Sequence, residues 1–91
     1  MARVIVTLCL MPTDPVVNLD ELRVSADKAI IQFGGELGKH AIEPVAFGLK
    51  ALKLWMIMPE ELGGTEPLEK SLAAVSGVES VVVEDVRRAV G

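Results

Sequence analysis

Two kinds of hydrophobic repeat alternate along this chain, and their order limits the possible folds more than any other feature. Four segments are dense in apolar and β-branched residues, which favour strands; they cover residues 3–11, 36–45, 49–58 and 78–86. Two other segments, after Asn18 and after Thr65, repeat apolar residues at spacings of three or four, the period of one helix face. The sequence therefore predicts the order strand, helix, strand, strand, helix, strand.

Local signals mark where both helices begin and end. Asn18 stands at an N-cap position, and Glu21 three residues later can return a hydrogen bond to the cap backbone. Gly34 follows the first apolar stripe and supplies the left-handed backbone that commonly ends a helix. Thr65 is expected to cap the second helix, and Gly77 to end it. The apolar stripe of this second helix consists of Leu68, Leu72 and Val75.

Six elements in this order pack compactly in few ways, because crossover connections between parallel strands are right-handed. The expected fold is α+β: a ferredoxin-like βαββαβ sandwich with a four-stranded antiparallel sheet in the order 4-1-3-2 and both helices on one face. A length of 91 residues, 51% of them hydrophobic, is enough for one core and too short for two, so one domain over residues 1–91 is expected. In this topology the turn at 46–48 lies at the opposite end of the sheet from residue 88.

The strand at 49–58 is expected in the middle of the sheet because it is apolar on both faces. Alternation places four of its residues toward the helices: Leu52, Leu54, Met56 and Met58. Trp55 falls on the outer face, so either that face packs on something or the assignment of faces is wrong. Ile5, Cys9 and Ile57 would lie beside Trp55.

Composition excludes several classes of function. There are 13 acidic and nine basic residues, a net charge of −4, and only two Phe and one Trp, so the basic, aromatic face that nucleic acids require is missing. With one Cys and one His, neither an internal disulfide, a metal site nor a bound cofactor is expected. No apolar run approaches the ~18–20 residues of a membrane span, which favours a cytoplasmic protein with no membrane partner.

A few residues stand out from this background. Arg87 and Arg88 are adjacent bases in an acidic chain, and they form either a solvated tail or a contact for a phosphate or carboxylate. The acidic pairs at 60–61 and 84–85 are expected on solvated surfaces, since neighbouring strand residues point to opposite faces. Phe47 lies beside Gly48 in a predicted turn, and one interpretation of Phe47 is as a core residue at that turn.

The chain resembles the archaeal family of translation elongation factor 1-beta over essentially its whole length, and three segments carry the resemblance. They are EPVAFGLKALKL at 43–54, GGTEPLEKSL at 63–72 and GVESVVVEDVRRAVG at 77–91. The exchange domain of the eukaryotic factor is similar in its FG-[LI]-K-x-L motif, matched here by Phe47, Gly48, Leu49, Lys50 and Leu52. Members of this family have the ferredoxin-like fold, in agreement with the predicted order of elements.

The resemblance implies a guanine nucleotide exchange factor, not an enzyme with covalent chemistry. Its partner would be the GTPase elongation factor 1-alpha, which itself binds GDP, GTP and Mg²⁺. In the eukaryotic family a lysine near the C-terminus enters the partner's magnesium site; alignment without a gap places Arg88 there, and Arg87 is the alternative. The Phe of the FG turn contacts a second domain of the partner, which implies a partner-binding role for Phe47 and Gly48.

A second hypothesis stays open beside the exchange factor. The ferredoxin-like fold serves many functions, and the chain could be a regulatory or oligomerisation module without exchange activity. Such a module would pair through an apolar outer face around Trp55, which is the feature that distinguishes the two hypotheses.

Overall fold

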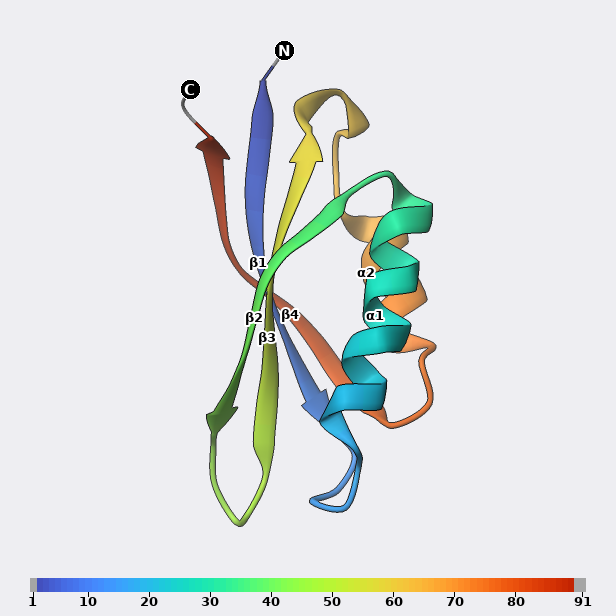
Figure 1. The fold of residues 1–91 in the computed structure, drawn as a ribbon, viewed down its shortest axis with the longest axis vertical. Coiled ribbons are helices and arrows are strands. Elements are labelled where there is room, and N and C mark those ends of the chain that lie inside the picture. The colour runs from blue at the N-terminus through green and yellow to red at the C-terminus, as the bar shows by residue number, and fades with distance from the viewer. Residues whose placement is uncertain (1, 90–91) are drawn as a thin grey trace.

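Four strands and two helices form two layers in the computed structural model, which describes residues 2–89 (Figure 1). The elements are β1 (Arg3–Pro12), α1 (Leu19–Phe33), β2 (Glu36–Pro44), β3 (Lys50–Pro59), the 3₁₀ helix η1 (Glu60–Leu62), α2 (Glu66–Ala73) and β4 (Val78–Ala89). The sheet order is β2-β3-β1-β4 with all neighbours antiparallel, and both helices cover one face. This confirms the predicted ferredoxin-like fold, with the order 4-1-3-2 read from the other edge.

The hydrophobic core lies between the sheet and the two helices. Every second residue of β1 and β3 points into it, as the period of a strand requires. The buried apolar residues are Val6, Leu8 and Leu10 of β1, Leu52, Leu54, Met56 and Met58 of β3, Leu22, Ala26 and Ile30 of α1, and Leu68 and Leu72 of α2. The predicted inward face of β3 is therefore confirmed. Among residues 2–89, no helix combines the length and the apolar character that crossing a membrane requires.

The ends of α1 follow the sequence signals closely. Asn18 Oδ1 accepts hydrogen bonds from the backbone N–H groups of Asp20 at 3.0 Å and Glu21 at 3.2 Å, which satisfies donors that a helix start leaves free. Gly34 ends the helix with a φ of 107°, a left-handed conformation that a residue with a Cβ rarely adopts. The predicted cap and stop residues of α1 are confirmed.

The ends of α2 differ from the prediction in two ways. Thr65 occupies the N-cap position, but its side chain makes no capping hydrogen bond. The hydroxyl instead donates to Glu69 Oε2 at 2.9 Å, and Pro67 in the first turn has no N–H that a cap side chain could accept. Helix α2 ends at Ala73, so Val75 lies beyond the helix, although it still packs against the core.

The last strand is longer than predicted and includes both arginines. It runs to Ala89, with Arg88 paired to Val4 and Arg87 to Ile5 of β1. The interpretation of these arginines as a solvated tail is therefore wrong, because their backbone belongs to the ladder. The whole molecule measures 42 × 21 × 18 Å. The β2–β3 hairpin lies at one end of its long axis, and the end of β4 lies at the other (Figure 1).

Candidate functional site

The tip of the β2–β3 hairpin carries a phenylalanine in an unusual conformation. Phe47 has φ 54° and Gly48 has φ 77°, and among residues 2–89 Phe47 is the one non-glycine residue with a positive φ. The Leu49 N–H donates to the Ala46 carbonyl at 2.9 Å, which closes the turn. Turns with two positive φ angles favour Asn-Gly or Gly-Gly, so an aromatic residue is unexpected here.

The Phe47 side chain is not buried against its own domain, so packing does not offset this strain. It is 96% exposed, whereas a left-handed backbone costs an L-residue about 1–2 kcal/mol. The interpretation as a core residue is therefore wrong. Strained backbone of this kind concentrates at functional positions, and a large exposed aromatic side chain is well suited to burial by a partner.

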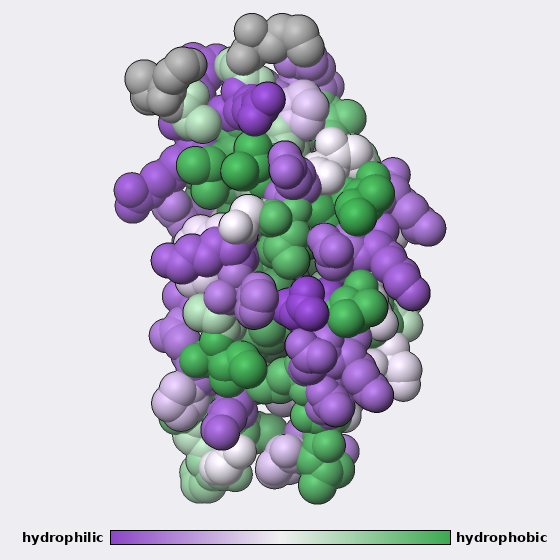
Figure 2. Space-filling model, in the orientation of Figure 1, coloured by the Kyte–Doolittle hydropathy of each residue, from purple (hydrophilic) through white to green (hydrophobic). Residues whose placement is uncertain are grey.

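Other exposed apolar side chains gather at the same end of the molecule. Val16 in the β1–α1 loop is 88% exposed, Val45 before the turn is 54% exposed and Ile42 on β2 is 52% exposed. Figure 2 shows apolar surface at the lower end, where Figure 1 places the hairpin and this loop. Grouped exposed apolar residues mark contact surfaces for other proteins. These four residues, Val16, Ile42, Val45 and Phe47, are called the apolar end below.

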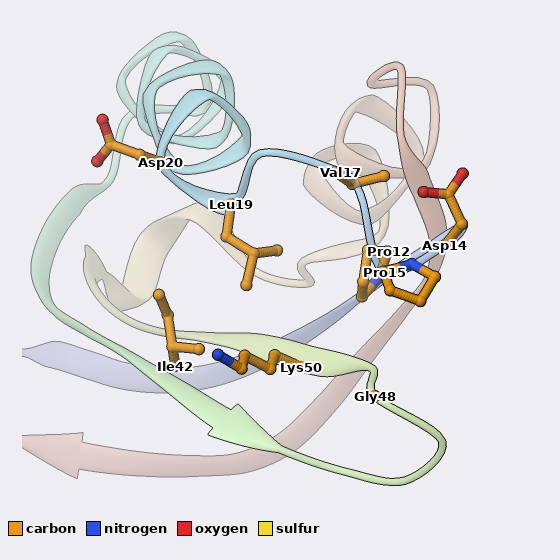
Figure 3. Close-up of a pocket in the computed structure, with 9 residues that line it drawn as sticks. All are labelled: Pro12, Asp14, Pro15, Val17, Leu19, Asp20, Ile42, Gly48 and Lys50. Carbon is orange, nitrogen blue, oxygen red and sulfur yellow. The ribbon is translucent and has the colours of Figure 1, made fainter.

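A groove of about 400 Å³ lies between the β1–α1 loop and the hairpin. Figure 3 shows Leu19, Ile42 and Lys50 around this groove, from the start of α1, from β2 and from β3. Pro12 and Pro15 line it from the loop side. The groove gives the apolar end a concave part next to the projecting Phe47.

The two arginines occupy opposite faces at the other end of the sheet. Residues directly opposite in an antiparallel pair share a face. Arg88 pairs with Val4, which packs against the core, so Arg88 belongs to the helix-bearing face. Arg87 pairs with Ile5 on the outer face. Only one of them can therefore enter a given pocket of a partner.

Each arginine has its own carboxylate partner. Arg88 Nη2 lies 2.5 Å from Glu60 Oε1, and Arg87 Nε lies 2.7 Å from Asp85 Oδ2. Both side chains stay exposed, Arg88 at 68% and Arg87 at 78%. The pairing of Arg88 with Glu60 joins residues 28 positions apart, so no local pattern in the sequence could have indicated it.

Alternation places the two arginines on opposite faces, and a β-bulge earlier in β4 sets which of them lies on which face. Leu8 pairs with Val83 and Thr7 with Asp85, which leaves Glu84 as the extra residue. Glu84 and Asp85 both line a shallow depression on the outer face. The expectation that these two acids point to opposite faces is therefore wrong, because the bulge interrupts the alternation.

The outer face of the sheet is charged over its centre. The ammonium groups of Lys39 and Lys53 lie 4.6 and 5.7 Å from the centre of the Trp55 ring. Lys53 also bridges Glu43 at 2.9 Å and Glu84 at 3.1 Å, and these hydrogen bonds raise the pKa of Lys53. The face is thus unlike the apolar surface that the oligomerisation hypothesis requires, and its Lys53 is paired with two carboxylates.

Two further side chains with reactive groups lie on the strands, Cys9 on β1 and His40 on β2. Cys9 is half-buried on the outer face, and burial, followed by the nearby Glu84 carboxylate, raises the pKa of its thiol, which lowers its reactivity. His40 is exposed on β2. Within residues 2–89, no three His, Cys, Asp or Glu side chains converge as they would around a metal ion.

Comparison with known proteins places these features in a family. Residues 5–89 match the family model described as the EF-1 guanine nucleotide exchange domain. A protein named Elongation factor 1-beta from Staphylothermus marinus is 49% identical over 89 residues, which cover 97% of this chain and 98% of the relative. A protein of the same name from Hyperthermus butylicus is 47% identical, and the match covers 97% of this chain and 96% of the relative. Another from Methanococcoides burtonii is 44% identical, and the match covers 99% of this chain and 100% of the relative. The chain therefore belongs to the EF-1 guanine nucleotide exchange domain family, among relatives named Elongation factor 1-beta.

Proposed function

We propose that this chain promotes the exchange of GDP for GTP on elongation factor 1-alpha during translation elongation. The observation that carries the proposal is the strained, exposed Phe47 at one end of a rigid sheet, with a cationic residue of β4 at the opposite end. Family membership supports the same activity. Residues 1–91 would act in the cytoplasm as one exchange domain.

The distance between the two ends follows from the strand register. Met58 and Arg88 both pair with Val4, so Arg88 lies level with the end of β3. Eight residues separate Lys50 from Met58, which at about 3.3 Å per residue is roughly 26 Å. A rigid separation of this size lets one small domain contact two separate regions of a GTPase at once.

The apolar end would provide most of the affinity. Phe47 projects from the turn that Gly48 makes possible, and Val16 and Val45 extend the apolar surface around it. Burying these side chains against an apolar surface of elongation factor 1-alpha is favourable in proportion to the area removed from water. This end would hold the complex together and determine its orientation.

The opposite end would act on the nucleotide. Arg88 is the proposed basic residue that enters the magnesium site of the partner, and Arg87 is the alternative on the other face. A guanidinium there competes with Mg²⁺ for the same negative charge and weakens the hold on the β-phosphate of GDP. GDP, GTP and Mg²⁺ are all held by the partner, so the chain itself needs no catalytic group and no cofactor.

Stopped-flow release of a fluorescent GDP analogue from elongation factor 1-alpha tests these roles. Arg88→Ala should lower the maximal release rate by tenfold or more and change the half-saturating concentration little. Arg87→Ala is the matched control, because it removes the same charge from the outer face. A double Arg87→Ala, Arg88→Ala variant with an unchanged rate would refute the insertion mechanism, and a loss only in Arg87→Ala would assign the role to Arg87.

A further inference from the structure

Glu60 holds the side chain of Arg88 on the helix-bearing side of the sheet. It is the first residue of η1, and its backbone N–H donates to the Ala2 carbonyl at 3.1 Å, which ties η1 to the start of β1. Strand β1 lies between β3 and β4. The contact between Glu60 Oε1 and Arg88 Nη2 therefore spans β1, and it draws the guanidinium back across its own domain.

We propose that Glu60 is an internal counter-ion that competes with the partner GTPase for Arg88 and thereby limits the rate of nucleotide release. This proposal rests on the proposed function, in which Arg88 enters the magnesium site. Glu60 is a positioning residue in it, because it acts only through Arg88.

Two physical reasons make the contact compete with insertion. Glu60 occupies Nη2, one of the two terminal nitrogens of the guanidinium, so a phosphate or carboxylate of the partner that binds both terminal nitrogens needs the same donor. If Glu60 followed Arg88 into the site, its carboxylate would approach the phosphates of the nucleotide, and like charges repel strongly where water is excluded. The ion pair must therefore open as Arg88 enters.

The exposure of the pair sets the size of the effect. The side chains of Arg88 and Glu60 are 68% and 41% exposed, and ion pairs in contact with solvent are weak. A closed pair of this strength lowers the population of free Arg88 by about two- to fivefold. The contact thus slows the step without preventing it.

The test uses Glu60→Gln, which removes the charge and keeps the size of the side chain. In the GDP-release assay its maximal rate should rise by about two- to fivefold, with the half-saturating concentration unchanged. Glu61→Gln is the matched control, since Glu61 is adjacent and exposed and has no ion pair among residues 2–89. It changes the net charge equally and should leave the rate as it is.

A double variant separates this proposal from a general effect on charge or folding. In the Arg88→Ala background, Glu60→Gln should have no effect, since the group it restrains is gone. A rise of the same size in that background, or an unchanged or lower rate in Glu60→Gln alone, would overturn the proposal. If Arg88→Ala alone leaves the rate unchanged, the insertion mechanism itself fails, which is a separate result. Thermal unfolding of each variant by circular dichroism shows whether a lower rate reflects lost structure.

Discussion

Replacing Phe47 by glycine should make the protein more stable and a weaker binder at the same time. The side chain is 96% exposed, so its removal loses almost no buried surface. Glycine adopts φ 54° without the penalty of about 1–2 kcal/mol that an L-residue bears, while its extra freedom in the unfolded chain costs about 0.5–1 kcal/mol. The net gain is about 0–1.5 kcal/mol, which raises the melting temperature by up to roughly 12 °C for a domain of this size.

The expected loss of affinity is much larger than this gain in stability. Burying a phenylalanine side chain against a partner is worth about 1.5–3 kcal/mol, which corresponds to a roughly 10- to 150-fold higher half-saturating concentration. The GDP-release assay measures that concentration, and thermal unfolding followed by Trp55 fluorescence measures stability. Phe47→Ala should bind as weakly as Phe47→Gly but lack the gain in stability, because alanine keeps the Cβ.

Two outcomes would refute this reasoning. If Phe47→Gly is less stable than the original chain, the aromatic ring contributes to the fold and its strain does not indicate a role in binding. If both variants keep the original half-saturating concentration, the apolar end is not the main contact. Ile31→Ala is the control for loss of exposed apolar surface, since Ile31 is 62% exposed on α1 and should not change binding.

Two further predictions concern stability. Leu54→Ala should lower the free energy of unfolding by about 3 kcal/mol or more, because Leu54 is fully buried in β3, and urea titration followed by circular dichroism would show it. The hydrogen bonds of Lys53 to Glu43 and Glu84 raise its folded pKa above the ordinary 10.5, so their contribution is complete below that pH and is lost as the pH rises through the folded value. The measurement uses a Cys9→Ala background, because the raised pKa of the Cys9 thiol would change stability with pH in the same direction. From pH 8 to 12, the free energy of unfolding should fall less steeply in the Lys53→Met variant than in the same background with Lys53 present.

The sequence predicts those parts of the structure that depend on a hydrophobic repeat or on residues close together in the chain. Alternation in β3 placed Leu54 and its inward neighbours in the core, and Asn18 and Gly34 marked the ends of α1, since hydrophobic period and helix termini depend on residues a few positions apart. Thr65 shows where this fails: its residue type and position predict a helix cap, but its hydroxyl donates to the Glu69 side chain and makes no capping hydrogen bond. A residue type alone does not decide between such partners.

The sequence singles out Phe47 and Arg88 as candidates whose roles stay predictions, and it does not predict their geometry. The pairing of Arg88 with Glu60 depends on the register of three strands and on the bulge at Glu84. A bulge moves every later side chain of the strand to the opposite face of the sheet. The Val and acidic residues of β4 are compatible with either face, so the sequence does not indicate where the bulge lies. The positive φ of Phe47 likewise depends on the whole hairpin, because the sequence Phe-Gly is compatible with several turn types.

Each end of the molecule carries one side chain with a proposed role in the exchange reaction. Phe47 is strained and exposed, and Arg88 is paired with a carboxylate in water. The two ends are about 26 Å apart along the strands, beyond the Debye length of roughly 8 Å at physiological ionic strength and beyond the range at which substitutions usually couple. Affinity and release rate can therefore vary independently, and the paired strands between them need only stay rigid for contact at one end to place the other.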